Sequence, residues 1–263
     1  MIIPTVVAKT FLGWHGSGRT RPGRIECEVG VDTLEFVTKL KFTHETTKLS
    51  LICELLAVQL ANDLGLRTAD PAMVLIDRDF CESILESSDR ERLERNMGLN
   101  FGSRYLHPGF GVPPVRDSLA GAELWRASEI FAFDALVQNV DRRRDNPNLL
   151  MKGNDLFLID HDLALVSSIL GIPHIDPWLP TAITFLKDHV FYKPLQGKNL
   201  ELDGFRAKLD RLFVDGKLYE ALANLPDEWT DGEESNLDKI SKHFEGLAQH
   251  QDDFFESVTK ILQ

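Results

Sequence analysis

The chain has 263 residues, of which 43% are hydrophobic and 27% charged, a balance typical of globular rather than disordered proteins. Its formal net charge of −12 argues against nucleic-acid binding over the whole surface, and no apolar run approaches the roughly 20 residues that cross a bilayer. Cys27, Cys53 and Cys81 form no CxxC pair, which argues against a disulfide framework or a zinc site. We therefore expect a cytoplasmic protein that binds neither membranes nor, directly, nucleic acid.

The first part of the chain predicts strands, one helix and a further strand. The start, MIIPTVVAKTFLGWHG, lacks the features of a signal peptide and alternates like an edge strand. Residues 24–42 alternate β-branched or aromatic residues with polar ones, which predicts two strands joined by a turn. Residues 43–66 have helical spacing, with Thr46 or Thr47 as the N-cap and Gly65 as the stop. The strand PAMVLID follows.

The second part of the chain is mainly helical. Residues 86–118 predict a surface loop with one short helix, and GAELWRASEIFAFDALVQNV predicts a buried helix. NLLM, KGND and LFLID then predict a hairpin, followed by three or four helices that end with one from about Ser235 to Leu262. The acidic stretch PDEWTDGEES predicts a solvated connection. The fold class is thus α+β, with a small mixed lobe over residues 1–80 and a larger helical lobe over residues 81–263.

A polar loop, NVDRRRDNPNLL, follows the predicted buried helix and contains Asp141, Asn146 and Asn148. The hairpin after it returns the chain to its starting point, which brings Asp160 close to Asn146. Carboxylate and amide oxygens are hard ligands that suit Mg²⁺ carrying nucleotide phosphates. Asp141 is then free to accept a proton from an attacking hydroxyl, as in kinase phosphoryl transfer. The alternative is that these residues only cap their own turns.

A kinase site also needs a lysine on a strand and a glutamate on the next helix. Lys39 lies in FVTKLKF, and Glu54 lies in LSLICELLAVQL, where nearly every neighbour is apolar. An unpaired carboxylate buried there would cost several kcal/mol in desolvation free energy, so we expect Glu54 to pair with Lys39. Two alternatives stay open: Glu54 faces solvent, or Lys41, on the same strand face, replaces Lys39.

These motifs, with NFGSRYL between the predicted lobes, resemble the HipA-like kinases, especially the compact subgroup. The resemblance covers residues 15 to about 165 and implies a two-lobed protein-kinase-like fold that uses ATP and Mg²⁺. By position, Asp141 resembles the catalytic base, whereas Asn146 and Asp160 resemble the metal ligands. Lys39 and Glu54 resemble the phosphate-anchoring lysine and its partner.

The stretch HGSGRTRPG lies where the family keeps its phosphate-covering loop, so Gly16, Ser17 and Gly18 are expected to approach phosphate. Some family members phosphorylate a serine in this loop, and Ser17 and Thr20 are the candidates here.

The chain departs from many kinases at Asp162, where a glycine is usual, so this side chain adds a second metal ligand, displaces the metal or points to solvent. Arg142 fits the family's Asp-Arg pair. Arg143 and Arg144 are unassigned: they contact a phosphate or an acidic substrate patch, or they form a solvated face with Asp145.

The resemblance implies a serine/threonine protein kinase with a protein substrate, and a toxin of a toxin–antitoxin pair with an antitoxin as partner. The alternatives are a catalytically silent nucleotide- or partner-binding protein and a small-molecule kinase. Retention of the base, both metal ligands and the Lys39–Glu54 pair argues against the silent protein.

Overall fold

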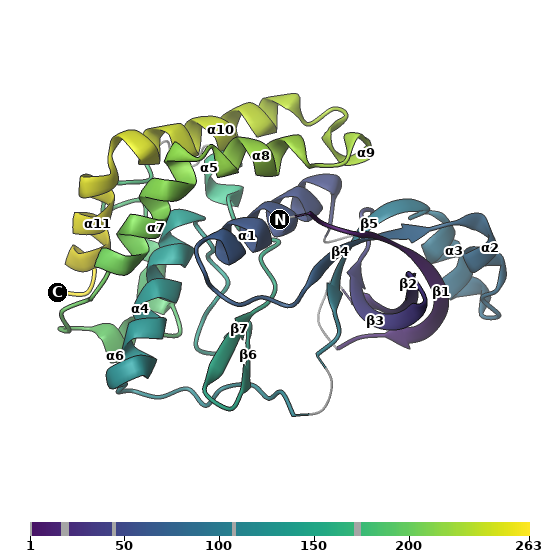
Figure 1. Cartoon of the computed structure of the whole chain (residues 1–263), viewed down its shortest axis with the longest axis horizontal. Helices are drawn as coiled ribbons and strands as arrows, with labels where there is room; N and C mark the ends of the chain where they lie inside the picture. Colours follow the sequence, from purple (N-terminus) through teal and green to yellow (C-terminus); the bar gives the residue numbers. More distant parts are fainter. Residues whose placement is uncertain (1, 17–20, 44–45, 107–108, 171–174) are drawn as a thin grey trace. The chain divides into compact units, whose positions relative to one another are not determined.

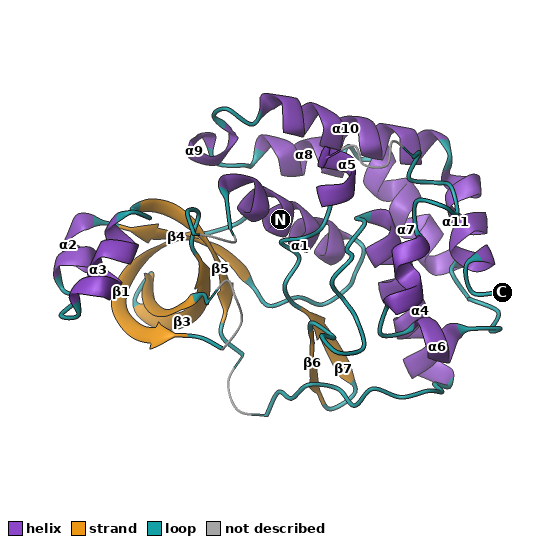
Figure 2. Ribbon diagram, turned by 180° about the vertical axis from the view of Figure 1, so that it is seen from behind, coloured by secondary structure: helices purple, strands orange, loops and turns teal. Residues whose placement is uncertain are grey.

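The computed structural model describes residues 2–16, 21–43, 46–106, 109–170 and 175–263. Strands dominate the N-terminal part of the chain and helices the C-terminal part, as Figures 1 and 2 show, so the α+β class is confirmed. Contacts divide the chain into two compact units. The barrel unit is Met1–Leu55, Ala69–Pro108 and Leu225–Asp231, and the helical unit is Leu56–Thr68, Gly109–Asn224 and Gly232–Gln263.

Five strands of the barrel unit close into a barrel in the order β1-β2-β3-β5-β4. Their bounds are Thr5–Trp14 (β1), Gly23–Val29 (β2), Asp32–Lys39 (β3), Pro71–Ile76 (β4) and Gly98–Arg104 (β5). The predicted edge strand is wrong, because β1 pairs antiparallel with β2 and parallel with β4. Its alternation instead reflects one face turned to the barrel core, where Val6 and Ala8 are buried. The predicted pair of strands around Gly30 is confirmed as the β2–β3 hairpin.

Helix α1 (Lys48–Asp63) has the ends that the sequence predicts. Thr47 is the N-cap: its hydroxyl accepts from the backbone N–H of Ser50 at 3.4 Å, and Ser50 Oγ accepts from the N–H of Thr47 at 3.3 Å. At the other end Gly65 takes a φ of +78°, and Leu66 donates its N–H to the carbonyl of Ala61 at 2.8 Å. The chain is thereby turned from α1 toward β4.

The stretch predicted as a loop contains α3 (Ser87–Glu94), as expected, but also strand β5, and α2 (Arg78–Glu82) precedes it. Four glycines and three prolines gave this stretch the appearance of a loop. Gly102, however, lies against β4 so closely that a Cβ there would be 2.5 Å from Val74 Cγ2. It marks a close strand approach rather than a turn. The barrel unit therefore extends past residue 80.

The first part of the acidic stretch predicted as a solvated connection, up to Asp231, is instead part of the barrel unit. It forms the short helix α9 (Asp227–Thr230), whose Trp229 is fully buried and donates Nε1–H to the carbonyl of Leu99 at 2.8 Å. Glu228 accepts the N–H of Leu99 at 2.9 Å and forms an ion pair with Lys41. A single buried tryptophan thus anchors a segment whose composition is otherwise that of a surface loop.

The helical unit contains the predicted buried helix and hairpin, both confirmed, and more helices than expected. Their bounds are Gly121–Leu136 (α4), Leu149–Lys152 (β6), Asp155–Leu158 (β7), Val166–Leu170 (α5), Thr184–Asp188 (η1), Tyr192–Leu195 (α6), Asp203–Val214 (α7), Lys217–Ala223 (α8), Glu234–Gln249 (α10) and Gln251–Lys260 (α11). The predicted last helix is broken in two at His250, whose backbone dihedral angles leave the helical region. The His250 ring stacks on Trp178, with 4.3 Å between the ring centroids. No helix in the described ranges is long and apolar enough to span a membrane.

His243 joins three elements of the helical unit, and its burial predicts acid sensitivity. Its Nε2–H donates to the carbonyl of Leu136 at 2.8 Å, and its Nδ1 lies 2.8 Å from Ser168 Oγ. Burial lowers the pKa of His243 to about 4. The unfolded chain binds this proton near pH 6.5 and the folded chain only near pH 4, so stability is lost as the pH falls between these values. The expected loss is about 3 kcal/mol by pH 4.

Urea unfolding at several pH values between about 4 and 7 would measure this loss in the wild-type chain and in His243→Gln. The variant should start less stable but should lose less stability on acidification. Equal slopes in the two proteins would show that His243 is not the group responsible.

Candidate active site

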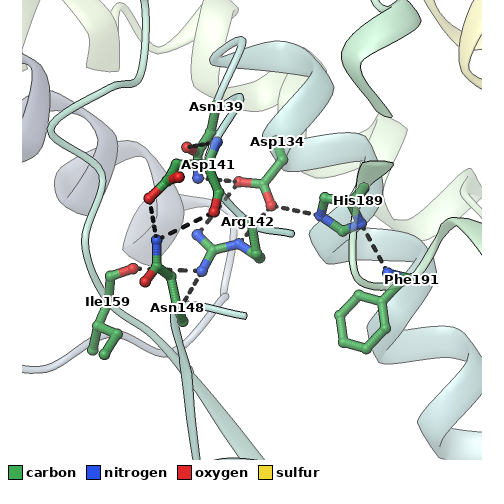
Figure 3. A network of polar contacts seen from close by, with 8 residues as sticks. All are labelled: Asp134, Asn139, Asp141, Arg142, Asn148, Ile159, His189 and Phe191. Atoms are coloured by element: carbon green, nitrogen blue, oxygen red, sulfur yellow. Dashed lines mark hydrogen bonds and ion pairs between the residues drawn. The ribbon is translucent and has the colours of Figure 1, made fainter. Parts of the chain in front are cut away.

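A buried ion pair fixes the polar loop that follows α4 (Figure 3). The side chains of Asp134, near the end of α4, and Arg142 are both completely buried, and Arg142 Nε lies 2.6 Å from Asp134 Oδ2. Arg142 also donates to the carbonyls of Asn148, at the end of the loop, and of Ile159, at 3.4 Å, after β7. One guanidinium therefore ties the start of the loop to its end and to the end of the hairpin.

His189 completes this network from a distant part of the chain. Phe191 donates its backbone N–H to His189 Nδ1 at 3.1 Å, so the ring proton is on Nε2, which donates to Asp134 at 2.9 Å. Burial lowers the pKa of His189, against the opposing effect of the Asp134 carboxylate. Burial alone would raise the pKa of Asp134, but Arg142 and His189 outweigh it and lower the pKa to about 2. The network thus holds a carboxylate, a guanidinium and a neutral imidazole at neutral pH.

Asp141 is oriented by two amides of its own loop. Its Oδ2 accepts from Asn146 Nδ2 at 2.8 Å and from Asn148 Nδ2 at 2.9 Å, and the side chain is 23% exposed. Its Oδ1 lies 3.7 Å from the guanidinium of Arg143. The carboxylate therefore has one oxygen fixed by hydrogen bonds and the other directed away from those amides, which suits a proton acceptor. The sequence pointed to Asn148 as part of the loop but gave it no role.

The hairpin returns the chain to this loop just before Asp160. Ile159, the residue before it, donates its N–H to the carbonyl of Asn148 at 3.1 Å. Asp160 has a φ of +60°, a strained conformation for a residue with a side chain and one that accumulates at functional sites. Asp162 is close by: a carboxylate oxygen of each lies within 4.8 Å of one of the other. Two carboxylates at this separation can bind one divalent cation.

The oxygen donors fit Mg²⁺. Asn146 turns its amide nitrogen toward Asp141, so its Oδ1 points elsewhere and is available as a ligand. With Asp160 and Asp162 this gives a set of hard oxygen donors, which Mg²⁺ prefers over nitrogen and sulfur. The departure at Asp162 is thus compatible with a second carboxylate ligand.

The barrel unit contains the predicted ion pair. Lys39 Nζ lies 2.7 Å from Glu54 Oε2, and the two side chains are only 10% and 3% exposed. Lys41 is instead engaged by Glu228 and by the carbonyl of Met97. The contacts therefore favour Lys39 over Lys41 as the lysine that the glutamate positions.

The predicted phosphate-covering loop connects β1 and β2. His15 donates its N–H to the carbonyl of Pro22 at 2.7 Å, which closes the base of the loop. Gly16 is exposed and has a φ of +69°, which favours glycine. Ser17, Gly18 and Thr20 lie outside the residues that the structure describes.

Comparisons with known proteins identify the family. A search of curated proteins found no match. A solved structure with a similar chain is the Helicobacter pylori proinflammatory kinase CtkA, at 12% identity over 98% of this chain and 96% of that one, with a TM-score of 0.48. The model of a family described as HipA-like kinase matches residues 15–258, which is most of the chain. The protein therefore belongs to the HipA-like kinase family.

Proposed function

We propose that the protein transfers the γ-phosphoryl group of Mg-ATP to a serine or threonine hydroxyl of a protein substrate. The observation that carries the proposal is the orientation of Asp141, whose Oδ2 is held by Asn146 and Asn148. Such a fixed carboxylate can take the proton of an attacking hydroxyl through Oδ1. Membership in a kinase family supports the reaction class.

Each unit contributes its own part of the proposed machinery. In the barrel unit Lys39, positioned by Glu54, contacts ATP phosphates, and the backbone at Gly16, Ser17 and Gly18 covers them. In the helical unit Asn146, Asp160 and Asp162 would hold Mg²⁺, which would supply positive charge to offset that of the phosphates. The buried Asp134–Arg142 pair keeps the loop rigid. Orientation and electrostatics of this kind supply most of the catalysis in phosphoryl transfer.

The acceptor and partner are supported by the family alone. The resemblance suggests a protein substrate and a role as the toxin of a toxin–antitoxin pair, with an antitoxin as partner. Location in the cytoplasm and the absence of a membrane or nucleic-acid partner belong to the same proposal, supported by the charge of −12.

The proposal is tested by incubating the purified protein with Mg²⁺ and γ-labelled ATP, alone and with cell lysate. Label on the protein itself or on a lysate protein, recovered as phosphoserine or phosphothreonine after hydrolysis, would support it. Label only on a small molecule would replace the protein substrate with a small-molecule acceptor. Thermal stabilisation by Mg-ATP without any transfer would favour a silent nucleotide-binding protein.

Loss of one metal ligand should weaken nucleotide binding in a metal-dependent way. In Asp160→Asn we expect the Kd of Mg-ATP to rise by about tenfold or more, because even residues that only support metal ligands cost roughly 10- to 100-fold in metal affinity. Binding of ATP in the presence of a chelator should change much less. Calorimetric titration with ATP, with and without Mg²⁺, measures both quantities.

Asp155→Asn is the matched control, since Asp155 lies on the same hairpin and pairs with Arg67 at the surface. It should bind Mg-ATP like the wild type. An equal Kd for Mg-ATP in Asp160→Asn and the wild type would remove Asp160 from the metal site.

A further inference from the structure

The three consecutive arginines of the loop have three different environments. Arg142 is buried and its donors bind Asp134 and two carbonyls. Arg144 lies at the surface, 2.9 Å from Asp117, which also pairs with Lys193. The side chain of Arg143 is neither buried nor within hydrogen-bond distance of the two carboxylates beside it, so it needs a separate explanation.

The backbone of Arg143 is tightly held although its side chain is not. Its N–H donates to the carbonyls of Asp141 at 2.9 Å and Asn146 at 3.0 Å. It also forms an antiparallel bridge with His189, and Val190 donates to the carbonyl of Arg142 at 3.0 Å. The Arg143 side chain therefore starts from a fixed point beside the proposed base.

The guanidinium of Arg143 lies beside the second oxygen of that base. It is 3.7 Å from Asp141 Oδ1 and 3.6 Å from Asp145 Oδ1, and the side chain is 46% exposed. Both distances exceed those of charge-assisted hydrogen bonds, which are about 2.7–2.9 Å. Among the residues that the structure describes, none accepts a side-chain hydrogen bond from Arg143 at such a distance. Its donors are thus available to a ligand that reaches Asp141.

We propose that Arg143 is a further catalytic residue that binds the phosphoryl group during transfer. The proposal rests on the proposed function. A hydroxyl that gives its proton to Asp141 Oδ1 lies about 2.7 Å from that oxygen. The phosphorus that it attacks is then only one bond further on, within reach of a guanidinium already 3.7 Å from Oδ1.

The step balances as a simple displacement. The acceptor oxygen forms a bond to the γ-phosphorus, and the bond from that phosphorus to the bridging oxygen of ADP breaks, so that ADP leaves with the electron pair. The hydroxyl proton moves to Asp141 Oδ1. Negative charge spreads over the three non-bridging oxygens of the transferring group. The planar guanidinium of Arg143 matches these oxygens and is always charged, so it can stabilise them.

The competing explanation is a surface ion pair in which Arg143 only bridges Asp141 and Asp145. Exposed ion pairs of this kind contribute little to stability or to geometry. Removing such a bridge would leave the rate almost unchanged, or would act only by changing the protonation of Asp141. The two explanations therefore differ in kinetics rather than in folding.

The test compares the full-length wild type with Arg143→Ala, Arg143→Lys and Arg144→Ala. Because the acceptor is unidentified, the probe is Mg-ATP, with self-labelling and slow release of phosphate to water as the two measured reactions. For Arg143→Ala we expect kcat to fall by about 100-fold or more, and the KM for Mg-ATP to stay within about threefold of the wild-type value. The reason is that arginines that stabilise a transferring phosphoryl group raise kcat by roughly 10³–10⁵-fold in other enzymes.

The lysine variant and the neighbouring arginine separate charge from position. Arg143→Lys keeps the positive charge but loses the planar, forked arrangement of donors. Its kcat should therefore lie between those of the wild type and Arg143→Ala. Arg144→Ala removes the same charge one residue away and should keep kcat within about threefold of the wild type, as expected for an exposed ion pair. All four proteins should have the same thermal midpoint.

Two results would overturn the proposal: equal kcat values in Arg143→Ala and Arg144→Ala, or a loss in Arg143→Ala that disappears on the high-pH plateau of kcat. The second would mean that Arg143 acts only on the protonation of Asp141. Wild-type transfer with an unaffected Arg143→Ala contradicts this inference alone. Absence of transfer in the wild type instead contradicts the proposed function and this inference with it.

Discussion

Asp141→Asn is expected to lower phosphoryl transfer by about 10²–10⁴-fold, the usual contribution of general base catalysis. Asparagine has the same shape and its oxygen can still accept from Asn146 or Asn148, so the loop should keep its conformation. What it cannot do is take the proton of the acceptor hydroxyl. The Kd of Mg-ATP should therefore stay within about threefold, because Asp141 is not among the proposed metal ligands. Single-turnover transfer from γ-labelled ATP and calorimetric titration measure the two effects.

Asp145→Asn is the control for this experiment. Asp145 lies in the same loop, is 77% exposed and contacts only the Arg143 side chain among its charged neighbours in the described chain. Its replacement should leave transfer within about threefold of the wild type, since exposed ion pairs contribute little. Transfer by Asp141→Asn at the wild-type rate would exclude Asp141 as the base, and the loop amides would then be no more than turn residues.

The elements with strong local signals were predictable from the sequence. Helix α1 has a capping threonine, an apolar middle and a terminating glycine. The threonine and the glycine act locally, through the hydrogen bonds at the two ends of the helix. The β6–β7 hairpin has a turn with Gly153 in a positive-φ conformation between two short apolar runs. In these places the backbone conformation depends on neighbours in the sequence.

The elements that were mispredicted depend on partners far along the chain. Strand β1 becomes part of a closed barrel only because β4, much later in the sequence, pairs with it. Gly102 indicates a loop when read alone, but a strand once Val74 lies against it. The acidic stretch around Trp229 indicates a surface loop until its contact with Leu99 is known. Local composition has no information about these partners.

The candidate site was predictable to a similar degree. The polar loop indicated Asp141 and Asn146, and the hairpin after it indicated Asp160. The isolated carboxylate of Glu54 in an apolar helix indicated its partner Lys39. The same signal was present at Asp134, which interrupts the apolar run FAFDAL, and it could have indicated a buried ion pair. His189 had no such signal, because it reaches Asp134 from 55 residues away.

The buried pair itself should be essential to folding as well as to activity. Asp134→Asn leaves the Arg142 guanidinium buried without its counter-charge, and Arg142→Met leaves the Asp134 carboxylate buried without most of its compensation. Each single variant should lower the free energy of unfolding by about 3–5 kcal/mol, the usual cost of breaking a buried ion pair from one side. Urea unfolding of the two variants and of the wild type measures this change.

The double variant separates stability from activity. When Asp134→Asn is combined with Arg142→Met, no unpaired charge is buried. The asparagine that replaces Asp134 can still accept from His189 or Asn139, so the loss of stability should be well below the sum of the single losses. The carbonyl of Asn148 keeps its bond from Ile159, but Arg142 no longer holds it or the carbonyl of Ile159. Transfer should therefore remain low although stability is partly restored.

Two outcomes would contradict this expectation in different ways. Strictly additive losses of stability would show that the charges of Asp134 and Arg142 do not compensate each other. A stable double variant with wild-type transfer would show that the loop holds Asp141 without the buried pair. We expect neither outcome, because the donors of Arg142 reach both ends of the loop. The Asp134–Arg142 pair should therefore stabilise the fold and also support catalysis, by holding Asp141 in position.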